Sequence, residues 1–138
     1  MHPLYEKASS LTGTVISAAI EVQKHFGTGL LESIYVKCLG RELNMRGLRT
    51  KKEVPVEIIY KDFSFTEHLY IDLLVEDCLV VEAKAVSPSR EGVDVFKAQT
   101  LSYLKLLNLP LGLLINFHNP ELGRCGTRRV LLKGANLP

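Results

Sequence analysis

The sequence predicts an α/β fold in which a mixed four-stranded sheet is flanked by helices. Two segments with helical periodicity come first, three extended segments follow, and a further helix leads into one more apolar strand. The chain of 138 residues has the size of one domain, and neither an internal repeat nor a low-complexity linker divides it. Hydrophobic residues make up 46% and charged residues 23%, which argues against a disordered or fibrous chain. We therefore expect a single domain over residues 1–138.

Two amphipathic helices are predicted before the first strand. Apolar residues recur at helical spacing over Ser10–Phe26, and Gly27 ends this helix. The second helix covers Leu30–Arg46, and Gly47 stands where a residue with left-handed backbone commonly terminates a helix. Each helix has an apolar stripe that can pack on a sheet.

Three extended segments follow the helices. Apolar residues alternate over Glu53–Tyr60, where Pro55 lacks an N–H and so favours an edge strand. Phe63–Val75 also alternates, whereas Cys78–Val86 is mostly apolar on both faces, as is typical of a central strand. We expect these three strands to form an antiparallel meander.

The last part of the chain predicts a crossover to a parallel strand. A loop at Ser87–Ser89 precedes a helix over Gly92–Leu107, and Pro110 marks the end of that helix. A right-handed crossover places the apolar strand Leu111–Phe117 parallel to the third strand. Val130–Leu132 is a candidate for a further strand, which the four-stranded prediction does not include.

Charge and cysteine content exclude several classes of protein. Lys and Arg total 17 against 15 for Asp and Glu, so any role with nucleic acid must depend on a local site. The three cysteines form no CxxC pair, which argues against a disulfide framework or a zinc site and fits a reducing compartment. The first ten residues lack the apolar core of a signal peptide, and no apolar run is long enough to span a bilayer. We expect a cytoplasmic protein with no membrane association.

Glu82 and Lys84 are ionisable residues inside the otherwise apolar third strand. Their spacing of two places both side chains on the same face of the sheet. Burying an unpaired charge costs several kcal/mol, so these groups must be paired, solvated in a cleft, or bound to a cation. A solvated face with a cross-strand salt bridge is the commoner arrangement, and it is the alternative to a metal site.

Asp72 lies ten positions before Glu82, in the preceding strand. A three-residue loop over Glu76–Cys78 would place Asp72 directly opposite Glu82, whereas a two-residue loop would place them on opposite faces. Facing carboxylates repel each other, and a divalent cation would relieve that repulsion. Hard cations such as Mg²⁺ take one or two carboxylates, a carbonyl and waters, and the carbonyl of Ala83 is a candidate ligand. The sequence thus predicts a metal site with Lys84 beside it.

Three further polar residues are candidates for the same cleft. Glu32 flanks the inward stripe of the second helix, where it either stabilises the positive end of the helix dipole or reaches the metal, and the two interpretations carry equal weight. Gln99 and Tyr103 are one helical turn apart and are expected to face inward and hold the substrate backbone. The alternative for this second pair is a polar stripe on the surface.

Together these residues resemble the motifs of the PD-(D/E)XK nuclease superfamily. Asp72 followed by Glu82-x-Lys84 on the next strand is similar to its metal-binding core, and Gln99-x-x-x-Tyr103 looks like the QxxxY motif of its RecB-like branch. The segment from Gly29 to Tyr35 resembles the motif of the GxxExxY family, small proteins of bacteria and archaea. The resemblance spans about Ile16 to Val130.

This resemblance implies a restriction-endonuclease-like αβββαβ core and hydrolysis of DNA phosphodiester bonds with Mg²⁺ or Mn²⁺. It implies catalytic roles for four residues: Asp72, Glu82, Lys84 and Glu32. Of these, the three carboxylates would hold the metal together with the Ala83 carbonyl, Lys84 would stabilise the attacking hydroxide, and Gln99 and Tyr103 would position the strand. DNA is the expected substrate, and RNA and a homodimer are left open.

Two other classes of function compete with this interpretation. One is a catalytically inactive nuclease-fold protein that binds nucleic acid or a protein partner, and the other is a structural or regulatory subunit with an unused cleft. The chain departs from the GxxExxY pattern at positions that bear on substrate contacts more than on metal ligands: Tyr70, Phe96 and Gln23. In the tail, we prefer a solvated surface to phosphate contacts for the basic residues Arg124, Arg128 and Arg129.

Overall fold

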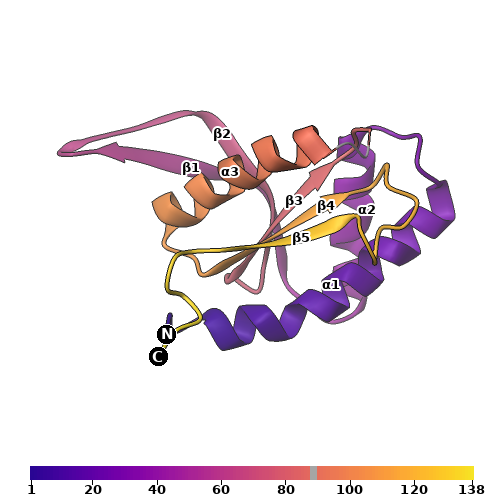
Figure 1. Ribbon diagram of the computed structural model, residues 1–138, viewed down its shortest axis with the longest axis horizontal. Coiled ribbons are helices and arrows are strands. Elements are labelled where there is room, and N and C mark those ends of the chain that lie inside the picture. The colour runs from indigo at the N-terminus through magenta and orange to yellow at the C-terminus, as the bar shows by residue number, and fades with distance from the viewer. Residues whose placement is uncertain (88–89) are drawn as a thin grey trace.

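The structure is a computed structural model that describes residues 1–87 and 90–138 and, of residues 90–94, the backbone only. Most of the loop predicted at Ser87–Ser89 therefore lies outside the described residues. The described residues form three helices and five strands (Figure 1). In chain order these are α1 (Tyr5–Phe26), α2 (Glu32–Met45), β1 (Thr50–Tyr60), β2 (Phe63–Val75), β3 (Leu79–Lys84), α3 (Arg90–Leu107), β4 (Leu111–Asn116) and β5 (Thr127–Leu131).

The five strands form one mixed sheet in the order β1-β2-β3-β4-β5. Neighbouring strands are antiparallel except β3 and β4, which are parallel and joined through α3. The αβββαβ core, the meander and the parallel crossover are therefore confirmed. β1 is outermost, as Pro55 indicated, and the central strands β3 and β4 are buried along almost their whole length.

The prediction of four strands is wrong by one. Thr127–Leu131 pairs antiparallel with β4 and extends the sheet at the edge opposite β1. Its sequence lacks a clear alternation because Arg128 and Arg129 are both exposed, and only Val130 is buried. Short, charged edge strands of this kind give a weak pattern in the sequence.

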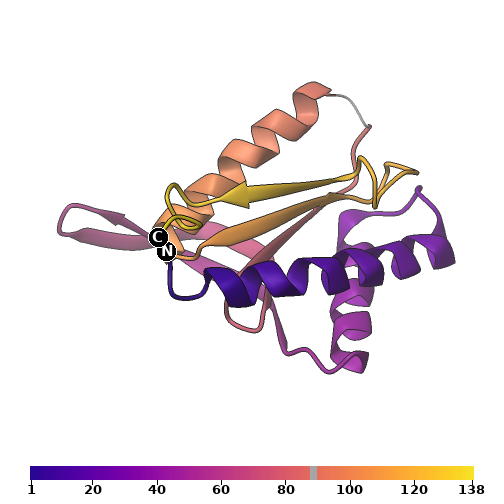
Figure 2. The same cartoon turned by 60° about the horizontal axis from the view of Figure 1, so that its bottom comes forward.

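Helices cover both faces of the sheet (Figures 1 and 2). α1 and α2 pack on one face through the larger apolar cluster, to which Val15, Ala19 and Leu39 belong together with Val81 of β3. α3 covers the other face, where Tyr103 and Leu104 belong to a second cluster with Val80. Alternation along β3 thus sends Val80, Glu82 and Lys84 towards the α3 side and Val81 towards α1 and α2. Within the described residues, no helix combines the length and apolarity needed to cross a membrane.

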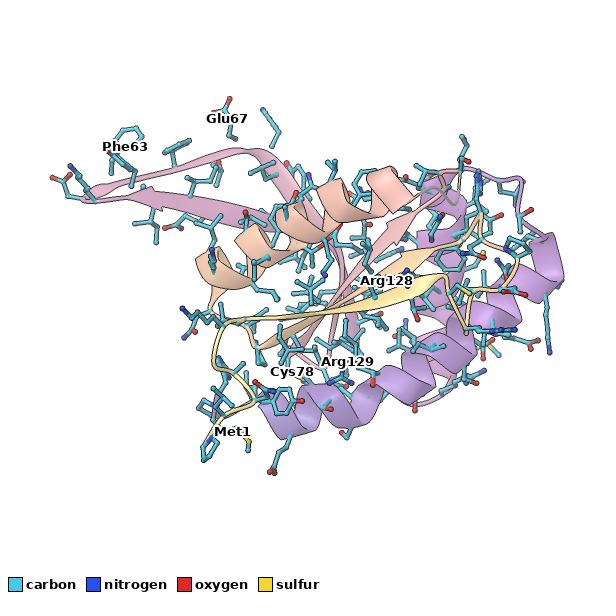
Figure 3. All side chains as sticks on the ribbon, in the orientation of Figure 1. Met1, Phe63, Glu67, Cys78, Arg128 and Arg129 are labelled. Carbon is cyan, nitrogen blue, oxygen red and sulfur yellow. The ribbon has the colours of Figure 1, made fainter. Side chains whose placement is uncertain are left out.

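β1 and β2 continue beyond the body of the molecule as a two-stranded ribbon (Figure 1). The register shifts between Pro55 and Glu57, so β2 has extra residues at this point, and the ribbon bends there. Figure 3 places Phe63 at the outer end of the ribbon and Glu67 at the bend. β2 therefore runs from an exposed tip into the centre of the sheet, where it carries Asp72.

Candidate metal and substrate site

The site lies where β2 and β3 stop pairing. Their backbone ladder joins Val75 to Leu79, Leu74 to Val80 and Leu73 to Val81, and it ends there. The three residues Glu76–Cys78 connect the two strands, so the next positions along the hairpin are Asp72 and Glu82, directly opposite each other. The register expected from a three-residue loop is confirmed.

The two carboxylates take the place of backbone hydrogen bonds beyond the end of this ladder. Oε1 of Glu82 accepts a hydrogen bond of 3.1 Å from the backbone N–H of Asp72. Oδ2 of Asp72 accepts one of 2.8 Å from the backbone N–H of Ala83. Each carboxylate is thereby held against the opposite strand through one of its oxygens. The second oxygen of each group is free of these backbone contacts.

Burial dominates the electrostatics of this acidic pair. Glu82 is only 3% exposed, and burial raises its pKa from 4.5 to about 8, with the charge of Asp72 adding to the rise. Burial also raises the pKa of Asp72, while the hydrogen bond from Ala83 and the charge of Lys84 oppose the shift. Two carboxylates this close cannot both be ionised cheaply without a nearby cation.

The donor set fits a hard divalent cation. Mg²⁺ is commonly bound through one or two carboxylates while it keeps several waters, so the oxygens of Asp72 and Glu82 suffice. The N–H and C=O of one strand residue point towards the same neighbouring strand, and the N–H of Ala83 points to Asp72. The Ala83 carbonyl therefore faces the same opening. Among the described residues, no group of three or more His, Cys, Asp and Glu side chains is placed to hold a metal ion together.

Lys84 lies beside the acidic pair. Its Nζ is 4.4 Å from the centroid of the Phe96 ring on α3, a cation–π contact. The ion pairs formed by the described residues do not join Lys84 to Asp72 or Glu82. Its positive charge nevertheless lowers the pKa of both carboxyl groups. The ammonium group thus stabilises negative charge at the site without occupying the carboxylate oxygens as an ion-pair partner.

Glu32 reaches the same site from α2. Its Oε1 accepts a hydrogen bond of 3.1 Å from the backbone N–H of Ala85, just past the end of β3. It lines a hollow of about 450 Å³ together with Asp72, and its charge contributes to the raised pKa of Asp72. Glu32 therefore begins a helix and borders the acidic pair. Its role as a metal ligand stays a prediction.

Tyr35 explains how Glu32 is held in place. Its hydroxyl donates a hydrogen bond of 2.6 Å to the carbonyl of Gly27 and accepts one of 3.1 Å from the N–H of Leu30. Its ring stacks on Phe117 with centroids 4.6 Å apart. The tyrosine thus ties the loop before α2 to the end of β4, which sets the position of the first turn of α2.

The two polar residues predicted on α3 differ in their exposure. Tyr103 is 5% exposed, and burial raises its pKa, with smaller contributions from the charges of Glu82 and Asp72. Gln99 is exposed, so the inward placement expected for it is wrong. Thr100 and Leu104 are buried in the middle of the face of α3 that contacts the sheet, and Gln99 lies at the border of that face.

The buried amide of Asn116, at the end of β4, was missed in the sequence. Its Oδ1 accepts hydrogen bonds of 3.2 Å from the N–H groups of Val86 and His118, and its Nδ2 donates one of 3.0 Å to the carbonyl of Val86. The N–H of Phe117 also donates to the carbonyl of Lys84 at 2.8 Å. A polar residue inside the otherwise apolar run Leu111–Phe117 was the available signal. Asn116 fixes the chain that leaves Lys84.

The basic residues of β5 are engaged within the chain. Arg129 donates to the hydroxyls of Ser9 and Tyr5 on α1 at 3.1 and 3.3 Å, and Figure 3 shows it above that helix. Arg128 donates to the carbonyls of Cys125 and Thr127 at 2.9 and 2.8 Å. These contacts favour a structural role over phosphate binding for both arginines.

Comparison with known proteins identifies the family. The model of a protein family described as the PD-(D/E)XK nuclease superfamily matches residues 9–130, from α1 into β5. No curated protein and no solved structure matches the chain significantly. The family match covers most of the 138 residues, and the αβββαβ topology agrees with a restriction-endonuclease-like fold. The chain therefore belongs to the PD-(D/E)XK nuclease superfamily.

Proposed function

We propose that this protein is a divalent-metal-dependent nuclease that hydrolyses phosphodiester bonds in DNA. Membership of the superfamily points to a nucleic-acid substrate and to a divalent metal. The observation that carries the proposal is the pair of carboxyl groups, Asp72 and Glu82, which replaces the backbone ladder between β2 and β3. Such a pair destabilises the fold unless charge of the opposite sign is supplied, and a metal supplies it.

The proposed ligands of Mg²⁺ or Mn²⁺ are Asp72, Glu82 and the Ala83 carbonyl, with Glu32 at the border of the site. When bound, the cation provides Lewis-acid chemistry that activates a water and offsets charge on the phosphate. The carboxylates of Asp72 and Glu82 need little rearrangement for this task, because each is already held through one oxygen. Preorganisation of this kind reduces the cost of assembling the site.

The remaining residues of the site bind and orient in this proposal. Lys84 stabilises the attacking hydroxide and the negative charge that develops on the phosphate oxygens, and the ring of Phe96 keeps its ammonium group next to the acidic pair. Tyr103 supports Glu82 from the α3 side, while Gln99, being exposed, contacts the substrate backbone. The assignment to the GxxExxY family, with a QxxxY motif on α3, is part of the same proposal.

A cleavage assay tests the function. Single-stranded, double-stranded and branched DNAs are incubated with Mg²⁺ or Mn²⁺ and either the wild type, Glu82→Ala or Lys84→Ala. We expect metal-dependent cleavage that either substitution abolishes. Glu76→Ala is the matched control, because it removes a carboxylate from the other end of the same hairpin and should leave cleavage unchanged. Cleavage that survives both site substitutions would show that the activity arises elsewhere or from a contaminant.

A further inference from the structure

Two hollows meet at the first turn of α2. The hollow over Asp72, of about 450 Å³, is lined by residues of α2, β1 and β2: Glu32, Ser33, Lys37, Lys52, Glu53 and Asp72. A second hollow of about 540 Å³ is lined by Glu32 and Ser33 again and by five residues from three further segments: Gly29, Leu30, Leu31, Ala85 and His118. Both hollows border on Glu32 and Ser33, so they adjoin at the first turn of α2, and the first also borders on Asp72; we call them the first and the second arm.

The first arm carries positive charge on both of its walls. Lys37 extends from α2, and Lys52 extends from β1, where it pairs with Leu73 next to Asp72. Both lysines are exposed, and neither forms an ion pair with another described residue. Three carboxyl groups and two ammonium groups line this arm, so a divalent cation changes its formal excess of one negative charge into an excess of one positive charge. The arm then suits a phosphate backbone.

The second arm has a different character. Apart from the shared Glu32, its lining contains no carboxylate, lysine or arginine, and Leu31 is 71% exposed within it. His118 has a fixed ring, since its Nε2 lies 2.9 Å from the carbonyl oxygen of Leu30 and its ring meets Tyr35 edge to face. Apolar and aromatic surfaces of this kind contact sugars and bases more readily than phosphates.

We infer that a nucleic-acid strand runs through both arms, so that the protein cuts internal phosphodiester bonds and needs no free strand end. Lys37 and Lys52 contact phosphates on one side of the scissile bond, and Leu31 and His118 contact sugar and base on the other. Exposed residues lie in the lining of each arm, which leaves both arms open to solvent along the described part of the chain. This inference rests on the proposed nuclease function, and it specifies the form of the substrate.

Circular DNA tests the absence of an end requirement. A closed single-stranded circle, a closed duplex circle and their linear forms are incubated with the wild type and Mg²⁺. We expect at least one circle to be cut at a rate comparable with its linear form. Digestion of linear DNA with both circles left intact would overturn the inference while leaving the nuclease function in place. If no DNA is cut, the proposed function fails, and the binding measurement described next decides whether the strand path exists.

Binding separates the two arms without requiring cleavage. The affinity of Lys84→Ala protein for a fluorescent oligonucleotide is measured in Mg²⁺ over a range of salt concentrations. Adding Lys37→Ala or Lys52→Ala should reduce the slope of log affinity against log salt by about 0.7 to 0.9 per lost phosphate contact. Adding Leu31→Ser should weaken binding with the slope unchanged, because this side chain contacts no phosphate.

Lys133→Ala is the matched control for these variants. Lys133 is exposed near the C-terminus and lines neither hollow, so both affinity and slope should stay unchanged. The strand path is wrong if neither Lys37→Ala nor Lys52→Ala alters the slope, or if Lys133→Ala alters it as much as they do. Circular dichroism confirms that the variants are folded, which is expected because the side chains substituted in addition to Lys84 are exposed.

Discussion

The β2–β3 hairpin carries an acidic pair at each end. The two pairs differ in their hydrogen-bonding and ion-pair partners and in the direction of their pKa shifts. At the turn, Oε2 of Glu76 accepts a hydrogen bond of 2.6 Å from the N–H of Arg49, and Asp77 forms an ion pair of 2.8 Å with Lys51. The hydrogen bond from Arg49 lowers the pKa of Glu76, and the bond from Lys51 lowers that of Asp77. At the open end, burial raises the pKa of both Asp72 and Glu82.

The contrast shows that residue type alone does not assign a role to a carboxylate. The turn pair contacts the basic side chains of Arg49 and Lys51, so its charge is satisfied and its role is structural. The open-end pair is removed from water, and Lys84 lowers its pKa without forming an ion pair with it. A buried acidic pair, in which the charge of one carboxylate makes ionisation of the other less favourable, is a candidate for binding a cation.

The largest expected difference between the two ends is in catalysis. Glu82→Gln should reduce the cleavage rate roughly 100-fold or more, because several kcal/mol of charge stabilisation at the phosphate depends on the metal it helps to hold. Glu76→Gln, the same chemical change at the turn, should leave the rate within about twofold. The measurement is the initial rate of cleavage in Mg²⁺. Equal losses in the two variants would mean that the open end has no special role.

The next difference is in the response of stability to metal. Mg²⁺ at about 100 times its dissociation constant should stabilise the wild type by about 2.7 kcal/mol. Asp72→Asn should abolish this stabilisation and raise the melting temperature in EDTA, because it removes the charge opposite Glu82 while an amide oxygen can still accept the bond from Ala83. Asp77→Asn should keep the response to Mg²⁺. Thermal unfolding followed by circular dichroism, with and without Mg²⁺, checks both expectations.

A smaller effect is expected from Phe96, whose ring lies below the ammonium group of Lys84. Phe96→Leu would remove the cation–π contact, which contributes about 1 kcal/mol to holding the ammonium group in place. Losing that amount of transition-state stabilisation corresponds to a fall in kcat of roughly fivefold. Phe96→Tyr should restore the rate because it keeps the aromatic face. Val95→Ala controls for effects on α3, since Val95 is 68% exposed. A rate that is equal in the leucine and tyrosine variants would remove Phe96 from the site.

The two pairs are also expected to differ in the sign of their pH dependence. The lowered pKa values of Glu76 and Asp77 mean that their stabilisation is present above the ordinary carboxyl range and is lost as the pH falls through it. Glu82 behaves oppositely, because a pKa raised from 4.5 to about 8 makes the metal-free fold lose stability as the pH rises between these values. In EDTA, the melting temperature of the wild type should fall as the pH rises through this range, and that of Glu82→Gln should not. An unchanged trend in that variant would contradict the assignment.

Most of the architecture could be predicted from local patterns. Helical periodicity located α1 and α2, and the continuous apolar runs identified β3 and β4 as the buried centre of the sheet. β5 was missed as a full strand because it is an edge strand whose stability comes from pairing with β4. The exposure of Gln99 was missed because helical spacing gives relative angles between residues and not the direction of the contact face.

The sequence by itself determined which residues could form the site, and it left two registers open, one for a two-residue loop and one for a three-residue loop. The three-residue loop of the structure places Asp72 opposite Glu82. Only the tertiary structure decided that the ladder ends at this point, that Glu32 arrives from α2, and that Phe96 rather than a carboxylate contacts Lys84. The physical reason is that hydrogen-bond registers are local to a hairpin. Burial and contacts between distant elements depend on how helices and sheet pack together.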